Sequence, residues 1–253
     1  MGLFDLPAPL FSAIDGVLGM ALPPLLRLVF WGILAGWLTM VVYRRFSNQE
    51  KIGELKVQQK VQQKKIAEFD GEFEQLMPLI RHTLALGFRQ LGHALGPALL
   101  STVPVLFLII WVAGAFGNEA PAAGSLVHLT AEPSNDDIHW SSMTAVEIAE
   151  DGWQVKWPGP GQSLTLTDGR QSLLTLPLND NIPIIHKKQW WNLLVANPIG
   201  YLPENGKTDI IHIDLPEQVI IGLGPSWMRG WMFSFFLTFL LSSLGTKFLL
   251  RID

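Results

Sequence analysis

The chain contains no cysteine and few charged side chains. Without cysteine among its 253 residues, it can form neither a disulfide nor a thiolate metal site. Charged residues make up 16% of the sequence, whereas water-soluble domains carry about 25%. The six histidines are scattered, and no phosphate-binding loop, dinucleotide-binding glycine pattern or nucleophile elbow is present. We therefore expect a membrane protein that is not an enzyme and holds no cofactor or metal.

Apolar residues form three runs that are long enough to cross a bilayer, which takes about 20 residues. The runs cover residues 22–43, 97–116 and 226–250. Core helices of a soluble protein would be shorter and would lack the flanking charges. The first run is not a good secretory signal, because Asp5 and Asp15 precede it and no small-residue cleavage site follows. The sequence therefore predicts three transmembrane helices.

Lysine and arginine are unevenly distributed around these runs. Nine of them lie between the first two runs: Arg44, Arg45, Lys51, Lys56, Lys60, Lys64, Lys65, Arg81 and Arg89. The segment 117–225 is acidic, and no basic residue precedes Arg27. Because basic loops stay on the cytoplasmic side, we expect a multi-pass protein of the cytoplasmic (inner) membrane. The predicted sides are the N-terminus outside, 44–96 in the cytoplasm, 117–225 outside, and the C-terminus, 251–253, in the cytoplasm.

Residues 1–21 have the pattern of an amphipathic helix. Apolar side chains recur at helical spacing, at Leu6, Leu10, Ile14, Val17 and Leu18. Asp5, Ser12 and Asp15 lie on other faces. This pattern predicts a helix that lies in the outer membrane interface.

The segment 117–225 has short alternating runs typical of β-strands. Asp151-Gly152 and Asp168-Gly169 occupy positions that tight hairpins favour. The fold class that follows is an α-helical integral membrane protein with an inserted small antiparallel β domain on the outer side. We expect Trp190-Trp191, Trp153 and Trp157 in this domain to be exposed, which suits a protein partner.

The segment 44–96 is predicted to form a cytoplasmic helical hairpin. A seam of alternating three- and four-residue spacing runs along it, at Ile52, Leu55, Gln59, Gln62, Ile66, Phe69, Phe73 and Leu76. Asp70-Gly71 or Met77-Pro78 marks the bend. The seam packs either within the chain or against a second chain as a coiled coil. The basic residues contact the ribosome or anionic lipid, or form a solvated face.

Small and hydroxyl-bearing residues recur inside the apolar runs. Gly32 and Gly36 form a G-x-x-x-G surface that lets another helix approach closely. Four hydroxyls share one face of the third run, at Ser234, Thr238, Ser242 and Thr246, and Ser101 and Thr102 precede Pro104 in the second. This hydroxyl stripe, Ser234 to Thr246, is either ordinary helix packing or one wall of a polar groove. Arg27 either extends to the outer headgroups or lines the same groove.

Three stretches together resemble the archaeal YidC-like branch of the YidC/Oxa/Alb superfamily. They are the basic stop "YRRFSNQEKIGELK" after the first run, "LGPALLSTVPVLFLIIWV", and the Trp-rich "LGPSWMRGWMFSFFLTFLLSSLGTKFLLRID". The resemblance covers roughly 1–116 and 215–253. The chain departs from the family in two ways. Its hairpin contains only Met77 where family members carry many methionines, and a β domain is inserted at 126–221. Arg27 is the nearest match to the positive groove residue of the family, but it lies toward the outer end of its run.

The resemblance implies a membrane protein insertase or chaperone. A hydrated groove would accept polar parts of client membrane proteins, and the hairpin would capture clients or ribosomes. The predicted groove residues are Arg27, Thr39, Ser101, Thr102, Ser234, Thr238, Ser242 and Thr246. The alternative is a structural or assembly subunit of a larger membrane complex, in which the glycines and the hydroxyl stripe are packing surfaces and the β domain binds a partner.

Overall fold

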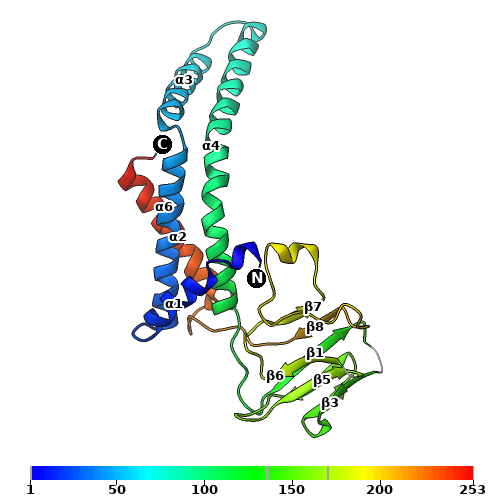
Figure 1. Cartoon of the computed structure of the whole chain (residues 1–253). Coiled ribbons are helices and arrows are strands. Elements are labelled where there is room, and N and C mark those ends of the chain that lie inside the picture. The colour runs from blue at the N-terminus through cyan, green and yellow to red at the C-terminus, as the bar shows by residue number, and fades with distance from the viewer. Residues whose placement is uncertain (1, 135–136, 170, 253) are drawn as a thin grey trace. The chain divides into compact units, whose positions relative to one another are not determined.

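The computed structural model describes residues 2–134, 137–169 and 171–252 of the chain (Figure 1). It divides into two compact units, which are described separately below. The β unit comprises residues 1–25 and 107–233, and the helical unit comprises 26–106 and 234–253. Three helices are long and apolar enough to cross a membrane, namely α2 (Pro24–Phe46), α4 (Phe73–Phe116) and α6 (Trp231–Leu250). The prediction of three candidate spans is confirmed.

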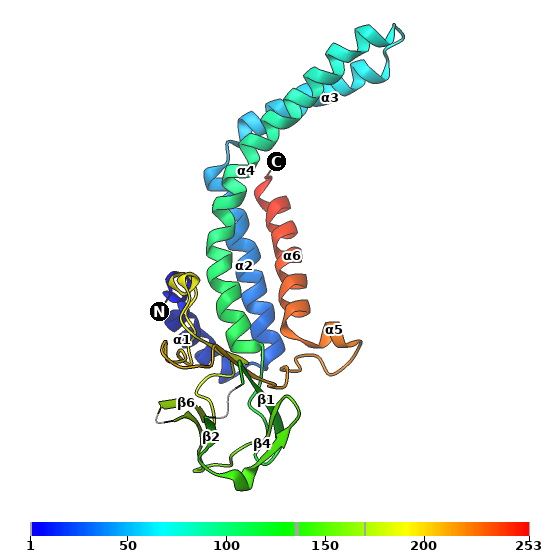
Figure 2. The same ribbon diagram turned by 90° about the vertical axis from the view of Figure 1, so that its right-hand side faces the viewer.

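In the helical unit, α6 lies alongside α2 at very short range (Figure 2). The short range depends on the two glycines of the G-x-x-x-G surface. A Cβ on Gly36 would lie 2.5 Å from the carbonyl oxygen of Phe239 and 2.8 Å from Cβ of Ser242. A Cβ on Gly32 would overlap the hydroxyl of Thr238. Glycine is therefore required at both positions for the two backbones to approach as they do.

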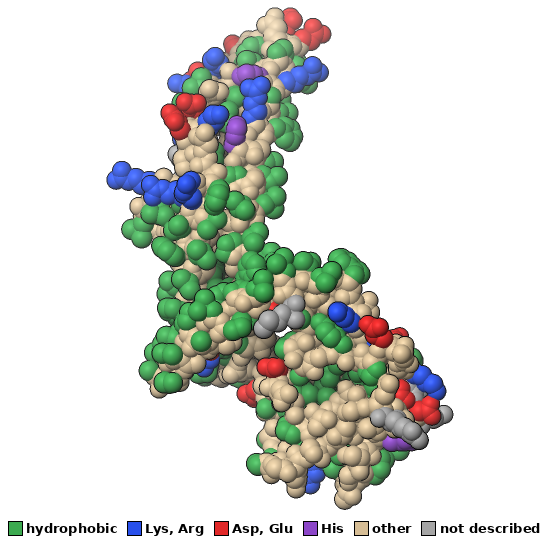
Figure 3. Space-filling view, viewed as in Figure 1, with side chains coloured by type: hydrophobic (Ala, Val, Ile, Leu, Met, Phe, Trp, Pro, Cys, Tyr) green, Lys and Arg blue, Asp and Glu red, His purple; other side chains and the backbone are tan. Residues whose placement is uncertain are grey.

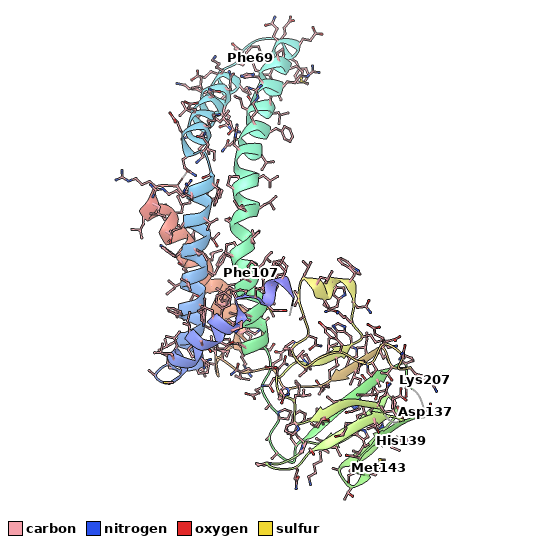
Figure 4. All side chains as sticks on the ribbon, viewed as in Figure 1. Phe69, Phe107, Asp137, His139, Met143 and Lys207 are labelled. Carbon is pink, nitrogen blue, oxygen red and sulfur yellow. The ribbon has the colours of Figure 1, made fainter. Side chains whose placement is uncertain are left out.

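The helical hairpin consists of α3 (Gln49–Ala67) and the first half of α4, which lie side by side in both views (Figures 1 and 2). Asn48 caps α3, because its side-chain oxygen accepts a hydrogen bond from the amide of Lys51 at 3.1 Å. The chain reverses at residues 68–72, around Asp70-Gly71, and Phe69 lies at this tip (Figure 4). Pro78 lies within α4.

The α3 part of the predicted seam faces inward. Ile52 is buried, and Leu55, Gln59, Gln62 and Ile66 are half-buried. A Cβ on Gly87 of α4 would lie 3.7 Å from the side-chain nitrogen of Gln59, so the two arms are in contact. Phe73 departs from the prediction, because it is 67% exposed. The turn at 68–72, at the first of the two predicted bend positions, resets the helical phase before Phe73.

Two helix boundaries do not coincide with those of the predicted segments. The second hairpin arm and the second span are one continuous helix, so no break separates 96 from 97. At 44 residues and 1.5 Å per residue, α4 is about 66 Å long, roughly twice the thickness of a bilayer core. The third span begins at Trp231 rather than at 226, because Gly230 adopts an extended backbone. This residue separates α6 from the one-turn helix α5 (Ser226–Arg229).

The β unit contains an antiparallel β region, as predicted. One sheet has the order β3-β4-β1-β8-β7 and the other β2-β5-β6. The strands are β1 (Leu126–Glu132), β2 (Ile138–Trp140), β3 (Val146–Ala149), β4 (Gly152–Lys156), β5 (Leu164–Asp168), β6 (Gln171–Leu176), β7 (Ile184–His186) and β8 (Ile210–Ile213). Two short 3-10 helices, η2 (Met143–Ala145) and η3 (Trp190–Leu193), lie among them. Gly169 has a φ of +59°, as the predicted hairpin turn requires.

Both sheets contribute to one hydrophobic core. Leu129 and Ile211 of the larger sheet are completely buried in it together with Leu166 and Leu176 of the smaller one. The prediction that Trp153 and Trp157 are exposed is wrong, because Trp157 is buried in this core and Trp153 packs against it. Burial alternates along β1 and β8, as expected for strands with one face toward a core. Each fully buried Leu or Ile stabilises the fold by about 1.5–3 kcal/mol relative to an exposed one.

The N-terminal segment belongs to the β unit and forms η1 (Leu3–Asp5) and α1 (Ala8–Gly19). Its aromatic residues pack on the last turns of α4. The rings of Phe4 and Phe107 are 5.1 Å apart (Figure 4), and the indole nitrogen of Trp111 donates to the hydroxyl of Ser12 at 2.9 Å. The apolar face that the sequence predicted remains exposed, at Leu6, Leu10, Ile14 and Val17.

Alanine at Gly36 should destabilise the protein, whereas alanine at Gly92 should not. We expect Gly36→Ala to lower the free energy of unfolding by about 1–3 kcal/mol, because a methyl group has no room against α6. Gly92 lies in α4, and nothing is within 4 Å of a Cβ built there. Gly92→Ala should therefore raise stability by about 0.5–1 kcal/mol through the higher helix propensity of alanine. Thermal unfolding in detergent tests the pair, and equal midpoints for the two variants would contradict the packing argument.

Candidate functional site

The contact between α2 and α6 is the part of the helical unit with the most polar chemistry. The hydroxyl of Ser242 donates to the carbonyl oxygen of Ile33 at 2.8 Å, and the hydroxyl of Ser243 lies 3.5 Å from the carbonyl oxygen of Gly36. Thr238 donates within its own helix, to the carbonyl oxygen of Ser234 at 2.8 Å and that of Phe235 at 3.0 Å. Hydroxyl groups thus link two apolar helices.

An open groove of about 410 Å³ lies beside this contact. It is lined by Ile33, Thr238, Leu241, Ser242, Gly245, Thr246 and Leu249. The lining is mostly apolar, with hydroxyls from three successive turns of α6. Because a hydroxyl has one donor and two acceptor positions, Thr238 and Ser242 donate to backbone carbonyls and still present oxygen atoms as acceptors. The groove can therefore accept hydrogen bonds from a polar group that enters it.

The structure brings together only part of the predicted groove set. Of the eight predicted residues, Thr238, Ser242 and Thr246 line the groove. Ser101 and Thr102 of α4 donate to the carbonyl oxygens of Ala98 and Leu99, in the preceding turn.

The remaining three predicted groove residues are also outside the lining. Thr39 donates to the carbonyl oxygen of Ala35 at 2.8 Å, within α2. Ser234 is buried, and its hydroxyl has no hydrogen-bond partner among the described residues. Arg27 is half-buried in the first turn of α2. Of the hydroxyl stripe, Thr238, Ser242 and Thr246 thus line the groove, and Ser234 does not.

A second surface on α4 was missed by the sequence analysis. Four large apolar side chains lie exposed on one face of the hairpin arm, at Leu84, Phe88, Leu91 and Leu95. Their spacing of four, three and four residues is visible in the sequence and is the signal that predicts such a stripe. Figure 3 shows hydrophobic side chains along this edge of the helix. We call these four residues the α4 stripe.

Basic side chains surround the hairpin. Lys51, Lys60, Lys64 and Lys65 of α3 are exposed. Lys64 lies 3.7 Å from the carboxylate of Glu68, and both side chains are mostly solvated. Such surface pairs contribute little to stability. The basic residues of α3 therefore form a solvated, positive face.

The β unit has a cavity of about 270 Å³ lined by His128, Thr130, Pro183, Ile184, His212, Ile213 and Asp214. His128 lies 3.2 Å from the carboxylate of Asp151. Among the described residues, no group of three or more histidines and carboxylates could hold a metal ion. Elsewhere in the unit, Lys207 pairs with Asp137 (Figure 4), and the hydrogen bond from Lys207, followed by its positive charge, lowers the pKa of Asp137.

Comparison with known proteins found no matching family model, no matching curated protein and no matching solved structure. Functional arguments for this chain therefore depend on its own residues.

Alanine substitutions at Ser234 and Ser242 should have opposite effects on stability. Ser242→Ala removes the hydrogen bond to Ile33 and should cost about 1 kcal/mol. Ser234→Ala removes a buried hydroxyl that lacks a partner, so it should leave stability unchanged or raise it. Thermal unfolding of the two variants in the same detergent tests this. A larger loss at Ser234 than at Ser242 would show that the Ser234 hydroxyl has a partner.

Proposed function

We propose that the protein is a membrane insertase or chaperone that shelters polar parts of client membrane proteins in the groove between α2 and α6. The observation that carries the proposal is the groove itself, in which three hydroxyl-bearing residues interrupt an otherwise apolar lining on a candidate membrane span. Each unsatisfied polar group in hydrocarbon costs several kcal/mol. A groove that accepts hydrogen bonds from client N–H groups would lower that cost.

The α4 stripe supports the same proposal. The stripe lies on the hairpin, in the part of α4 that precedes the second apolar run. Exposed apolar patches commonly mark interaction sites, and an apolar client segment is a suitable occupant. The stripe continues along α4 with exposed Leu99 and Val103, so a captured segment could pass along one helix face from the hairpin to the span. We propose that leucine and phenylalanine here take the place of the methionines expected from the resemblance.

The proposed orientation follows from the distribution of lysine and arginine. With the hairpin in the cytoplasm, the α4 stripe would meet new proteins where they are made. The basic face of α3 would contact the ribosome or anionic lipid there. The β unit would lie outside, and the proposed location is the cytoplasmic membrane.

Filling the groove tests the insertase proposal without removing a hydroxyl. Gly245 lines the groove, and nothing lies within 4 Å of a Cβ built on it. We expect Gly245→Phe to fold normally and to reduce insertion of a single-span model client with a short outside tail into proteoliposomes. Gly114→Phe is the control, because Gly114 is also a helical glycine with no neighbour within 4 Å and is outside the groove. Equal insertion by both variants would refute the groove mechanism.

A structural or assembly subunit is the second candidate function. The tight glycine contact and the hydroxyls that donate to backbone carbonyls favour it, because they are features of helix packing. In this case the groove would hold one permanent partner helix.

Crosslinking from two leucines of α6 distinguishes the two functions. Leu241 lines the groove and is 59% exposed, whereas Leu237, one turn earlier, is 44% exposed and is not part of the lining. A photo-crosslinking residue at 241 should capture many newly made membrane proteins if the protein is an insertase, and one stoichiometric partner if it is a subunit. The same residue at 237 should mainly meet lipid. Identical products from both positions would show that the groove is not a specific site.

A further inference from the structure

We propose that η3 (Trp190–Leu193) anchors the β domain in the headgroup region of the same bilayer that the three candidate spans cross. Its occupant is the lipid surface, in place of the protein partner that Trp190-Trp191 suggest from sequence alone. The inference is independent of whether the protein inserts clients or belongs to a complex.

The side chains of η3 suit a membrane interface. Trp190 is 78% exposed and Leu193 is 72% exposed, and residues three apart lie on the same side of a 3-10 helix. Tryptophan and leucine are typical of segments that enter the boundary between headgroups and acyl chains. No acidic residue occurs from 181 to 203, and exposed Lys188 lies just before η3. Within 181–203 itself, no negative side chain therefore opposes an approach to phosphate groups.

Backbone groups on either side of η3 and the side chain of Asn192 are paired within the protein. Asn192 is buried, and its side chain accepts from the amide of Gln189 at 2.7 Å and donates to the carbonyl oxygen of Val195 at 2.9 Å. The amide of Leu194 donates to the carbonyl oxygen of Trp191 at 2.9 Å. Because unpaired backbone groups are costly in lipid, this pairing makes the turn suitable for contact with apolar surroundings.

Within the β unit, the N-terminal segment holds η3. The amide of Phe4 donates to the carbonyl oxygen of Leu194 at 2.8 Å. One carboxylate oxygen of Asp5 accepts from the amides of Gly2 and Ala196 at 2.8 and 2.7 Å. Gly2 is packed so closely that a Cβ on it would lie 2.5 Å from the carbonyl oxygen of Leu194. The N-terminal segment is thus joined to residues 194–196, which directly follow η3 (Figure 1).

This attachment places η3 beside a candidate span. Phe4 packs on Phe107, and Phe11 packs on Trp111 at 5.7 Å between ring centroids. Phe107 and Trp111 belong to α4, in the same unit. The neighbouring exposed side chains are also apolar, at Leu3, Leu6 and Leu10. Exposed apolar side chains that lie beside a candidate membrane span favour lipid as the occupant.

Single cysteines provide the test, because the natural chain has none. Trp190→Cys and Leu193→Cys are made in the full chain, labelled with an environment-sensitive fluorophore and placed in nanodiscs of phosphatidylcholine and phosphatidylglycerol. Ile148→Cys is the matched control: Ile148 is also 78% exposed, and it lies on β3 at the opposite edge of the sheet from β7, which precedes η3. Quenching by a nitroxide on the upper acyl chain is compared with quenching by aqueous iodide.

We expect the labels at 190 and 193 to show blue-shifted emission, quenching by the lipid nitroxide and protection from iodide, and the label at 148 to show the reverse. Iodide quenching at all three positions with no lipid quenching would overturn the proposal. Lipid quenching at all three positions would overturn it too, because contact would then not be specific to η3. Protection at 190 and 193 in native membranes but not in nanodiscs would identify a protein partner in place of lipid. Two anchor positions guard against a single variant that fails to fold.

Discussion

Backbone polar groups that lie in apolar surroundings must find partners within the protein, and this requirement shapes both units. It makes helices of the three apolar runs, because a helix satisfies its own amides and carbonyls. Side-chain hydroxyls inside these helices face the same requirement. Those of Thr39 and Ser101 meet it by donating to carbonyl oxygens of the preceding turn. Ser242 instead uses a carbonyl of the neighbouring helix, which the small size of Gly32 and Gly36 allows.

On α6, the close contact with α2 and the open groove lie next to each other along the hydroxyl stripe. Ser242 contributes to both, since its hydroxyl donates to the carbonyl oxygen of Ile33 and the residue also lines the groove. Gly245 leaves space where a larger residue would fill the groove. The same helix packing would serve an insertase or a subunit of a complex. The two proposed functions differ only in what occupies the groove.

The β unit has its own core, which is built from both sheets. The unit also includes the N-terminal segment and the last turns of α4. The chain therefore fixes η3 from two sides: β7 leads into it, and the amide of Phe4 and the carboxylate of Asp5 hold the residues that follow it. A rigid turn with paired backbone groups loses little conformational freedom when it binds a surface. This property lowers the conformational-entropy cost of the proposed lipid contact of Trp190 and Leu193.

By itself the sequence determined the three apolar helices, the hairpin between the first two and the antiparallel character of the inserted region. These features follow from hydropathy and from periods of 3.6 and 2, which are local properties. The tertiary structure decided what the local pattern leaves open. It showed that α4 runs without a break through residue 96, that Gly230 delays the third helix, and that Phe73 faces solvent. It also decided which hydroxyls share a groove, because every residue of a helical stripe has the same spacing, and only the position of the neighbouring helix separates Thr238, Ser242 and Thr246 from Ser234.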